Sequence, residues 1–229
     1  MYTRCKIGAR LALVAALVFT SSQAAARGDA AYQVTITNLT HAIIFTPILV
    51  ASHRRPLDIF DLGAPASDDL KAIAEGGDID PMSATLNANS QVVDVQSSGG
   101  PLLPGHSVTV IVDGAHGARY ISLASMMLPT NDGFIALASA RVSKRGSVTL
   151  YSPGYDAGSE ANDELCANIP GPICGGMGLS PGDNNPGDEN YVHIHRGTHG
   201  IGDLADDVFD WLNPVARITV TRVGDGEDE

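Results

Sequence analysis

Hydrophobic and polar residues alternate along much of the chain, and this period of two is typical of half-buried β-strands. In residues 32–39 (YQVTITNL), Val34 and Ile36 fall on one face and Thr35 and Thr37 on the other. Further segments that alternate or are rich in β-branched residues are 43–51, 107–113, 119–128, 133–142, 147–151, 191–195 and 215–223. Clusters of Gly, Pro, Asn and Asp separate them, so the sequence predicts an all-β domain of the sandwich kind.

Two segments depart from a plain strand pattern. Pro47 interrupts the apolar segment 43–51 and predicts an edge position or a bulge, because proline cannot donate a ladder hydrogen bond. Residues 67–75 (SDDLKAIAE) are predicted to form a short helix. Ser67 can cap its N-terminus, two acids lie in its first turn, and a Gly-Gly pair ends it.

The C-terminal half contains a long loop and a second short helix. Residues 204–211 are predicted to form one helical turn, and Trp211 is predicted to join the core beside the last strand. Residues 152–190 are rich in Gly, Pro, Asn and Asp, and within them 182–190 (GDNNPGDEN) could add calcium ligands. A loop of this length is either functional or without fixed structure.

The N-terminus has the layout of a secretory signal peptide. Arg4, Lys6 and Arg10 precede nine apolar residues at 11–19, and small residues follow at 20–26. Nine residues are too few to cross ~30 Å of hydrocarbon, so a transmembrane anchor is the weaker alternative. We therefore expect a signal peptide at 1–26, a mature domain at 27–223 without a transmembrane segment, and an acidic tail at 224–229. The localisation would be secreted or periplasmic.

Charge and composition exclude several classes of protein. The 229 residues carry a net charge of −12, and removal of the three basic residues of the signal peptide takes it to −15. With only three lysines, the chain is not expected to bind nucleic acid. Hydrophobic residues make up 44% of the sequence and charged residues 17%, which disfavours both an intrinsically disordered chain and a coiled coil.

Two cysteines remain after signal cleavage. Cys166 and Cys174 are eight positions apart, and the intervening ANIPGPI can curl back on itself. In an exported chain this spacing favours one local disulfide over two free thiols.

Three loop carboxylates are candidate calcium ligands. Asp132 lies between two predicted strands, and Asp156 and Glu160 follow the strand that ends near Tyr151. If these strands are neighbours, the carboxylates gather at one end of the sandwich and repel one another unless a cation lies among them. Calcium takes about six to eight oxygen ligands in loose geometry. The alternative is that these acids are simply solvated.

Several motifs, in their order, resemble the spondin N-terminal domain family, which includes the domains of F-spondin and mindin and many secreted bacterial proteins. The similarity extends over about residues 32–223, from YQVTITNLT to DWLNPVARITVTRV. Three motifs carry it. The first is a Ser-Met pair (Ser125 and Met126), and the second is a Pro-x-x-Asp turn (residues 129–132) followed by the aromatic Phe134. The third is an Asp-Ala-Gly loop (residues 156–160, DAGSE).

The resemblance implies an antiparallel β-sandwich related to calcium-and-lipid-binding domains. It also implies a calcium ion held by Asp132, Asp156 and Glu160. Animal members usually have Asp where this chain has Glu160, and an aromatic residue where it has Gly133. Glu reaches further than Asp, so the calcium affinity is not carried over with the motif.

Histidines form the alternative metal site. His193, His195 and His199 are spaced H-x-H-x3-H, and the first two would project from the same face of a strand. Such a set could bind zinc, as a metal-trafficking protein or a metal-dependent hydrolase would, or it could be a hydrogen-bonded surface pair.

No nucleophile elbow of the G-x-S-x-G type is present, and the chain is not expected to be an enzyme. The sequence therefore favours a secreted, calcium-binding adhesion or matrix-interaction module. The expected partner is an extracellular protein or a surface glycan.

Overall fold

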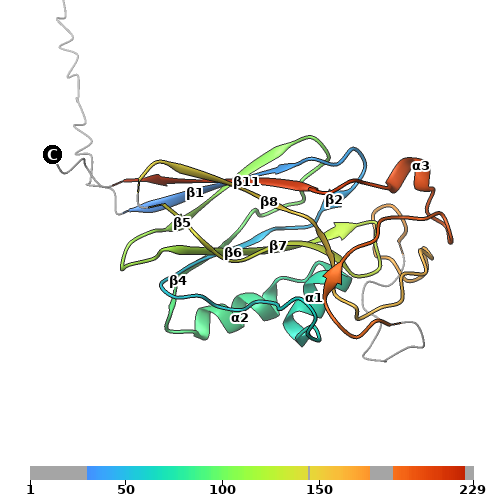
Figure 1. The fold of residues 1–229 in the computed structure, drawn as a ribbon, viewed down its shortest axis with the longest axis horizontal. Coiled ribbons are helices and arrows are strands. Elements are labelled where there is room, and N and C mark those ends of the chain that lie inside the picture. Colours follow the sequence, from blue (N-terminus) through green and yellow to red (C-terminus); the bar gives the residue numbers. More distant parts are fainter. Residues whose placement is uncertain (1–29, 144, 176–187, 225–229) are drawn as a thin grey trace, which may run out of the picture.

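Two antiparallel β-sheets packed face to face form the body of the domain in the computed structural model (Figure 1). The structure describes residues 30–143, 145–175 and 188–224, so the predicted signal peptide and most of segment 182–190 lie outside it. The first sheet has the strand order β5-β1-β11-β8. Its strands are β1 (Ala31–Asn38), β5 (Ser107–Asp113), β8 (Ser147–Ser152) and β11 (Ala216–Val223).

The second sheet has the order β10-β9-β7-β6-β3-β4, with β2 paired to β6 outside this path. Its strands are β2 (Ile44–Phe45), β3 (Leu49–His53), β4 (Val92–Ser97), β6 (Tyr120–Leu128), β7 (Gly133–Arg141), β9 (Gly154–Asp156) and β10 (His193–Ile194). All its strand pairs are antiparallel, and the prediction of an all-β antiparallel sandwich is confirmed.

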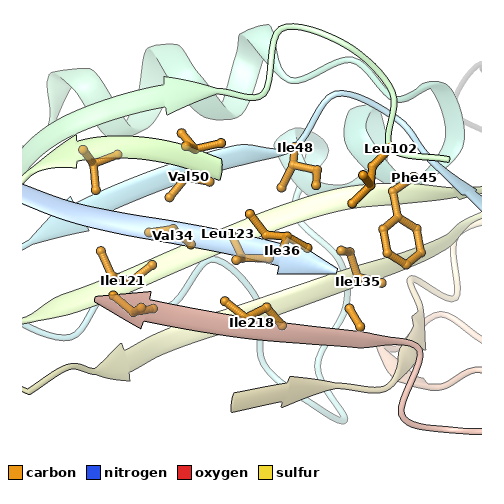
Figure 2. Packing of buried hydrophobic residues seen from close by; sticks show 14 of the residues in the cluster. Val34, Ile36, Phe45, Ile48, Val50, Leu102, Ile121, Leu123, Ile135 and Ile218 are labelled. Carbon is orange, nitrogen blue, oxygen red and sulfur yellow. The ribbon is translucent and has the colours of Figure 1, made fainter. Parts of the chain in front are cut away.

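The main core lies between the two sheets (Figure 2). Val34 and Ile36 of β1 are fully buried there and pack with side chains of the facing sheet such as Ile121 and Leu123. The alternate residues of β1 form the outer face, where Thr35 bonds Thr109 of β5. The alternation seen in the sequence therefore marks which side of the sheet is buried.

Three short helices accompany the sheets: α1 (Asp68–Gly76), α2 (Asp80–Ala88) and α3 (Asp206–Phe209). As predicted, Ser67 caps α1 by accepting a hydrogen bond from the Leu70 N–H, and Gly77 ends it with φ of 66°. Helices α1 and α2 cover the outer face of the second sheet (Figure 1). Because β6 is covered on both faces, almost all of its residues are buried, and buried residues do not alternate with exposed ones.

Three elements of this layer were not predicted: α2, β4, and β9, which lies within the segment 152–190 that was expected to be a loop. Helix α2 buries only Met82 and Leu86, and every residue of β4 is half-buried or exposed, so neither has a strong hydrophobic period. Pro47 lies in the interruption between β2 and β3, both of which pair with β6. The proline thus marks an irregularity of the strand, while β3 itself lies inside the sheet.

The loops that follow β6, β9 and β10 gather at one end of the sandwich (Figure 1). The predicted disulfide is confirmed there: Cys166 and Cys174 are joined, with their Cα atoms 4.6 Å apart. Both cysteines pack against a small apolar cluster that includes Ile169 and Leu204. Trp211 belongs to the main core, as predicted. Among the described residues, no helix is long and apolar enough to cross a membrane.

Candidate functional site

Strand pairing brings three of the predicted site residues to one place. Asp156 is the last residue of β9 and lies opposite Gly133 of β7, which directly follows Asp132. On its other side, Asp156 lies opposite His193 of β10. The predicted calcium ligands and the predicted zinc ligands therefore share one end of the sheet.

Asp132 is fully buried and only half satisfied. Its Oδ2 accepts hydrogen bonds from the backbone N–H groups of Ser159 (2.7 Å) and Glu160 (3.0 Å). Its Oδ1 is buried and accepts no hydrogen bond. Burial raises the pKa of Asp132 well above its ordinary value, and the nearby charge of Asp156 raises it further. This carboxylate is costly to ionise unless a cation is near.

Asp156 is also fully buried, and it holds the Asp-Ala-Gly loop together. Its Oδ1 accepts the Gly158 N–H (2.8 Å), and its Oδ2 accepts the amide of Asn162 (2.7 Å). Gly158 has φ of 65°, and a Cβ there would collide with the backbone of Tyr191, so the loop requires glycine at this position. Burial raises the pKa of the Asp156 carboxyl group.

Glu160 completes the predicted calcium set. It is 5% exposed, its N–H bonds Asp132, and its charge contributes to the raised pKa of Asp132. A further acid that the sequence did not reveal approaches from α1. Glu75 is buried, bonds the side chain of Ser159, and has a pKa raised by burial and by the charge of Asp188. Buried carboxylates from a turn, a loop and a helix therefore lie at the same end of the sheet.

His193 lies in β10, whereas His195 lies just after it, so only the first of the two histidines is in a strand. The two also differ in which ring nitrogen carries hydrogen. The Nδ1 of His193 lies 3.0 Å from the carbonyl oxygen of Ile194, which can only accept, so this nitrogen donates. The Nδ1 of His195 accepts the N–H of Gly197 at 3.0 Å. Burial lowers the pKa of His195 to about 3, and its ring packs on Trp211 with the ring centres 4.9 Å apart. His195 is therefore neutral, with its hydrogen on Nε2.

Both Nε2 atoms face Asp156. That of His193 is 3.4 Å from Oδ1, and that of His195 is 3.9 Å from Oδ2. His199 is exposed, and its backbone N–H, rather than its ring, bonds Glu164.

One group of side chains in the described part of the chain has the spacing of metal ligands. Asp156, Glu189 and His193 each offer one ligand atom, and these atoms all lie within 4.8 Å of one another. Asp132, Asp156 and Glu160 do not form such a group, so a shared calcium ion requires their carboxylates to move closer together. His195 and His199 are also outside the group. Glu189 was anticipated only as part of the acidic segment 182–190, because nothing in the sequence places that segment beside Asp156.

Comparison with protein families matches residues 35–161 to the family Spondin_N. The chain belongs to the Spondin_N family. The matched residues of this spondin domain include Asp132, Asp156 and Glu160, while Glu189, His193 and the disulfide lie beyond them. A search of curated proteins found no match to the chain. Membership of this family and the Cys166–Cys174 disulfide fit an extracellular protein.

Proposed function

We propose that this spondin domain is a non-enzymatic, secreted interaction module whose loop end is organised by a calcium ion bound to Asp132, Asp156 and Glu160. The observation that carries the proposal is the buried Oδ1 of Asp132, which accepts no hydrogen bond although the other carboxylate oxygen accepts three, two of them from backbone N–H groups. A buried carboxylate oxygen in this state needs a proton or a cation.

The surroundings favour a cation over a proton. Asp156 lies close enough to raise the pKa of Asp132, and Glu160 and Glu75 add further carboxylates to the same end of the sheet. Single protons would have to neutralise each acid separately, whereas one divalent ion neutralises two at once. The donors of the predicted set are all oxygens, which is the chemistry that calcium selects.

Calcium would fix the loop end as a binding surface. The backbone N–H groups of residues 159 and 160 bond Asp132, so an ion on this carboxylate ties the β9 loop to the β6–β7 turn. Large apolar side chains of the neighbouring loops remain exposed, among them Leu165, Ile201 and Leu212. We propose an extracellular protein or a surface glycan as the partner, with these loops as the contact region.

Calorimetric titration of calcium into the chain tests the ligand set. Asp132→Asn keeps the size of the side chain, and its amide oxygen can still accept the two backbone N–H groups. The NH2 group then replaces the buried Oδ1, so we expect calcium affinity to fall at least about tenfold, or 1.4 kcal/mol. Asp58→Asn, at an exposed acid outside the cluster, is the matched control and should bind like the wild type. Equal affinities in all three proteins would contradict the proposal.

A further inference from the structure

We infer that His193, Asp156 and Glu189 form a second metal site, specific for a transition metal ion of the zinc class, beside the proposed calcium carboxylates. The site combines one imidazole nitrogen with two carboxylate oxygens, and its ligand atoms lie within 4.8 Å of one another. Two of its three residues lie beyond the part of the chain that matches the family. The inference does not depend on calcium being bound.

The tautomer of His193 leaves the correct nitrogen free to bind an ion. Its Nδ1 donates to the carbonyl oxygen of Ile194, so in the neutral ring Nε2 carries the lone pair. This arrangement, in which a backbone carbonyl orients the ring, is typical of metal-binding histidines.

At the centre of the site, Nε2 of His193 faces a carboxylate oxygen, and this is a contact between two acceptors when the ring is neutral. The Nε2 lone pair of His193 is 3.4 Å from Oδ1 of Asp156, and this Nε2 has no hydrogen-bond partner. Two ligands at about 2.1 Å from a tetrahedral ion lie about 3.4 Å apart. The contact therefore has the separation of two ligands of one ion, and a direct hydrogen bond would bring these atoms closer.

Glu189 supplies the third ligand from another segment. It lies just before β10 in the chain, and its Oε2 is buried without a hydrogen-bond partner. Asp156 is fully buried, while His193 and Glu189 are partly exposed. The ligand atoms are therefore shielded from solvent, while the two residues beside Asp156 remain partly exposed.

His195 is excluded as a ligand, although the sequence gives it the same standing as His193. Its Nδ1 accepts a backbone N–H, so the hydrogen of the neutral ring lies on Nε2, the atom that faces Asp156. Its ring packs on Trp211 instead.

The donor set decides the class of ion. Imidazole nitrogen suits zinc, cobalt, nickel and copper, whereas calcium is bound by oxygen. Asp156 belongs both to this site and to the proposed calcium set, so an ion bound at one site would change the net charge at the other. The two sites should therefore be distinct, with the affinity of each depending on whether the other is occupied.

Cobalt(II) titration provides the test, because its visible absorption and paramagnetic NMR shifts report ligand type. The chain is purified without a histidine tag, freed of metal with EDTA and kept at mildly alkaline pH, where protons compete least for the imidazole. We expect one strongly bound cobalt ion. The Nδ1 hydrogen of one histidine should give a shifted, exchangeable NMR signal, assigned to His193 by its loss in His193→Gln. Zinc should displace the cobalt.

Variants separate this site from the calcium site. His193→Gln and Glu189→Gln should each weaken cobalt binding by at least about tenfold to a hundredfold, and His199→Gln should leave it unchanged. Asp132→Asn should keep cobalt binding while calcium affinity falls, and His193→Gln should keep calcium binding.

Three results would overturn the inference. The first is a folded wild type that binds no cobalt. The second is cobalt binding that His193→Gln does not weaken. The third is loss of calcium affinity together with cobalt affinity in His193→Gln, because a single ion would then use all the ligands. A wild type that binds cobalt as expected but does not bind calcium would contradict only the proposed function.

Discussion

Two histidines of the second sheet have the same tautomer, but the Nε2 of one faces a hydroxyl group and the Nε2 of the other faces a carboxylate. His53 of β3 and His193 of β10 each lie with Nδ1 on a backbone carbonyl oxygen, that of Arg55 and that of Ile194. The Nε2 of His53 meets the hydroxyl of Ser122 at 3.0 Å, and Ser122 in turn accepts the N–H of Ser139. The Nε2 of His193 meets a carboxylate oxygen instead.

The difference separates a structural buried histidine from one that is suited to bind a ligand. Around His53 every donor meets an acceptor, so the cluster is complete without a ligand. Around His193, the neutral ring turns a nitrogen lone pair toward a carboxylate oxygen, and the fully buried Asp132 adds an oxygen without a hydrogen-bond partner. Burial alone is therefore a poor guide to function in this domain, and the balance of donors and acceptors is a better one.

The largest expected effect comes from the residue shared by both proposed sites. Asp156→Asn should abolish the stabilisation by calcium and by cobalt together. For a ligand at 100 times its dissociation constant this stabilisation is about 2.7 kcal/mol. Urea unfolding with either metal, compared with EDTA, measures the loss. A variant that keeps the full stabilisation by both ions would remove Asp156 from both sites.

The complementary change disrupts the satisfied cluster. Ser122→Ala leaves Nε2 of His53 and the N–H of Ser139 without partners in a buried site, so we expect a loss of about 1–3 kcal/mol. The loss should be the same in calcium and in EDTA, because no metal is proposed there. Ser90→Ala, at an exposed serine, is the control and should change little. A metal-dependent effect of Ser122→Ala would break the distinction between the clusters.

The two clusters should also respond to pH in opposite directions. Burial lowers the pKa of His53, so the unfolded chain binds a proton more readily, and this residue's contribution to stability falls as the pH drops below about 6.5. Burial raises the pKa of Asp132, so in EDTA its contribution is present at acid pH and is lost as the pH rises above about 4.

Unfolding free energies at several pH values in EDTA measure both trends. His53→Gln should reduce the loss of stability on acidification, and Asp132→Asn should reduce the loss on raising the pH. Calcium should reduce the loss of stability that Asp132 causes as the pH rises, since the ion replaces the proton. Identical pH profiles for the wild type and both variants would show that neither group titrates as its burial requires.

The sandwich could be predicted because its strands have a clear period. Val34 and Ile36 alternate with Thr35 and Thr37, and the structure buries the first pair and leaves the second pair on the outer face. The cap and stop of α1 were equally local, since Ser67 and Gly77 act on their own helix. Helix α2 and β4 were missed because few of their residues are buried.

The candidate site could be predicted only in part. Asp132, Asp156 and Glu160 lie in turns directly after strands, so their convergence follows from the order of the strands. Glu75 and Glu189 arrive from a helix and a distant loop, and their approach depends on tertiary packing. The distinct roles of His193 and His195 depend on single hydrogen bonds of their rings, which a sequence does not contain.

A thermal melt of the wild type and Asp132→Asn, each in calcium and in EDTA, tests the central claim most directly. The claim is that the unsatisfied carboxylates at the loop end bind a cation. Calcium should raise the melting temperature of the wild type clearly and that of Asp132→Asn much less. In EDTA the variant should melt at or above the wild type, because a buried charge has been removed. A wild type that melts at the same temperature with calcium and with EDTA would contradict the account.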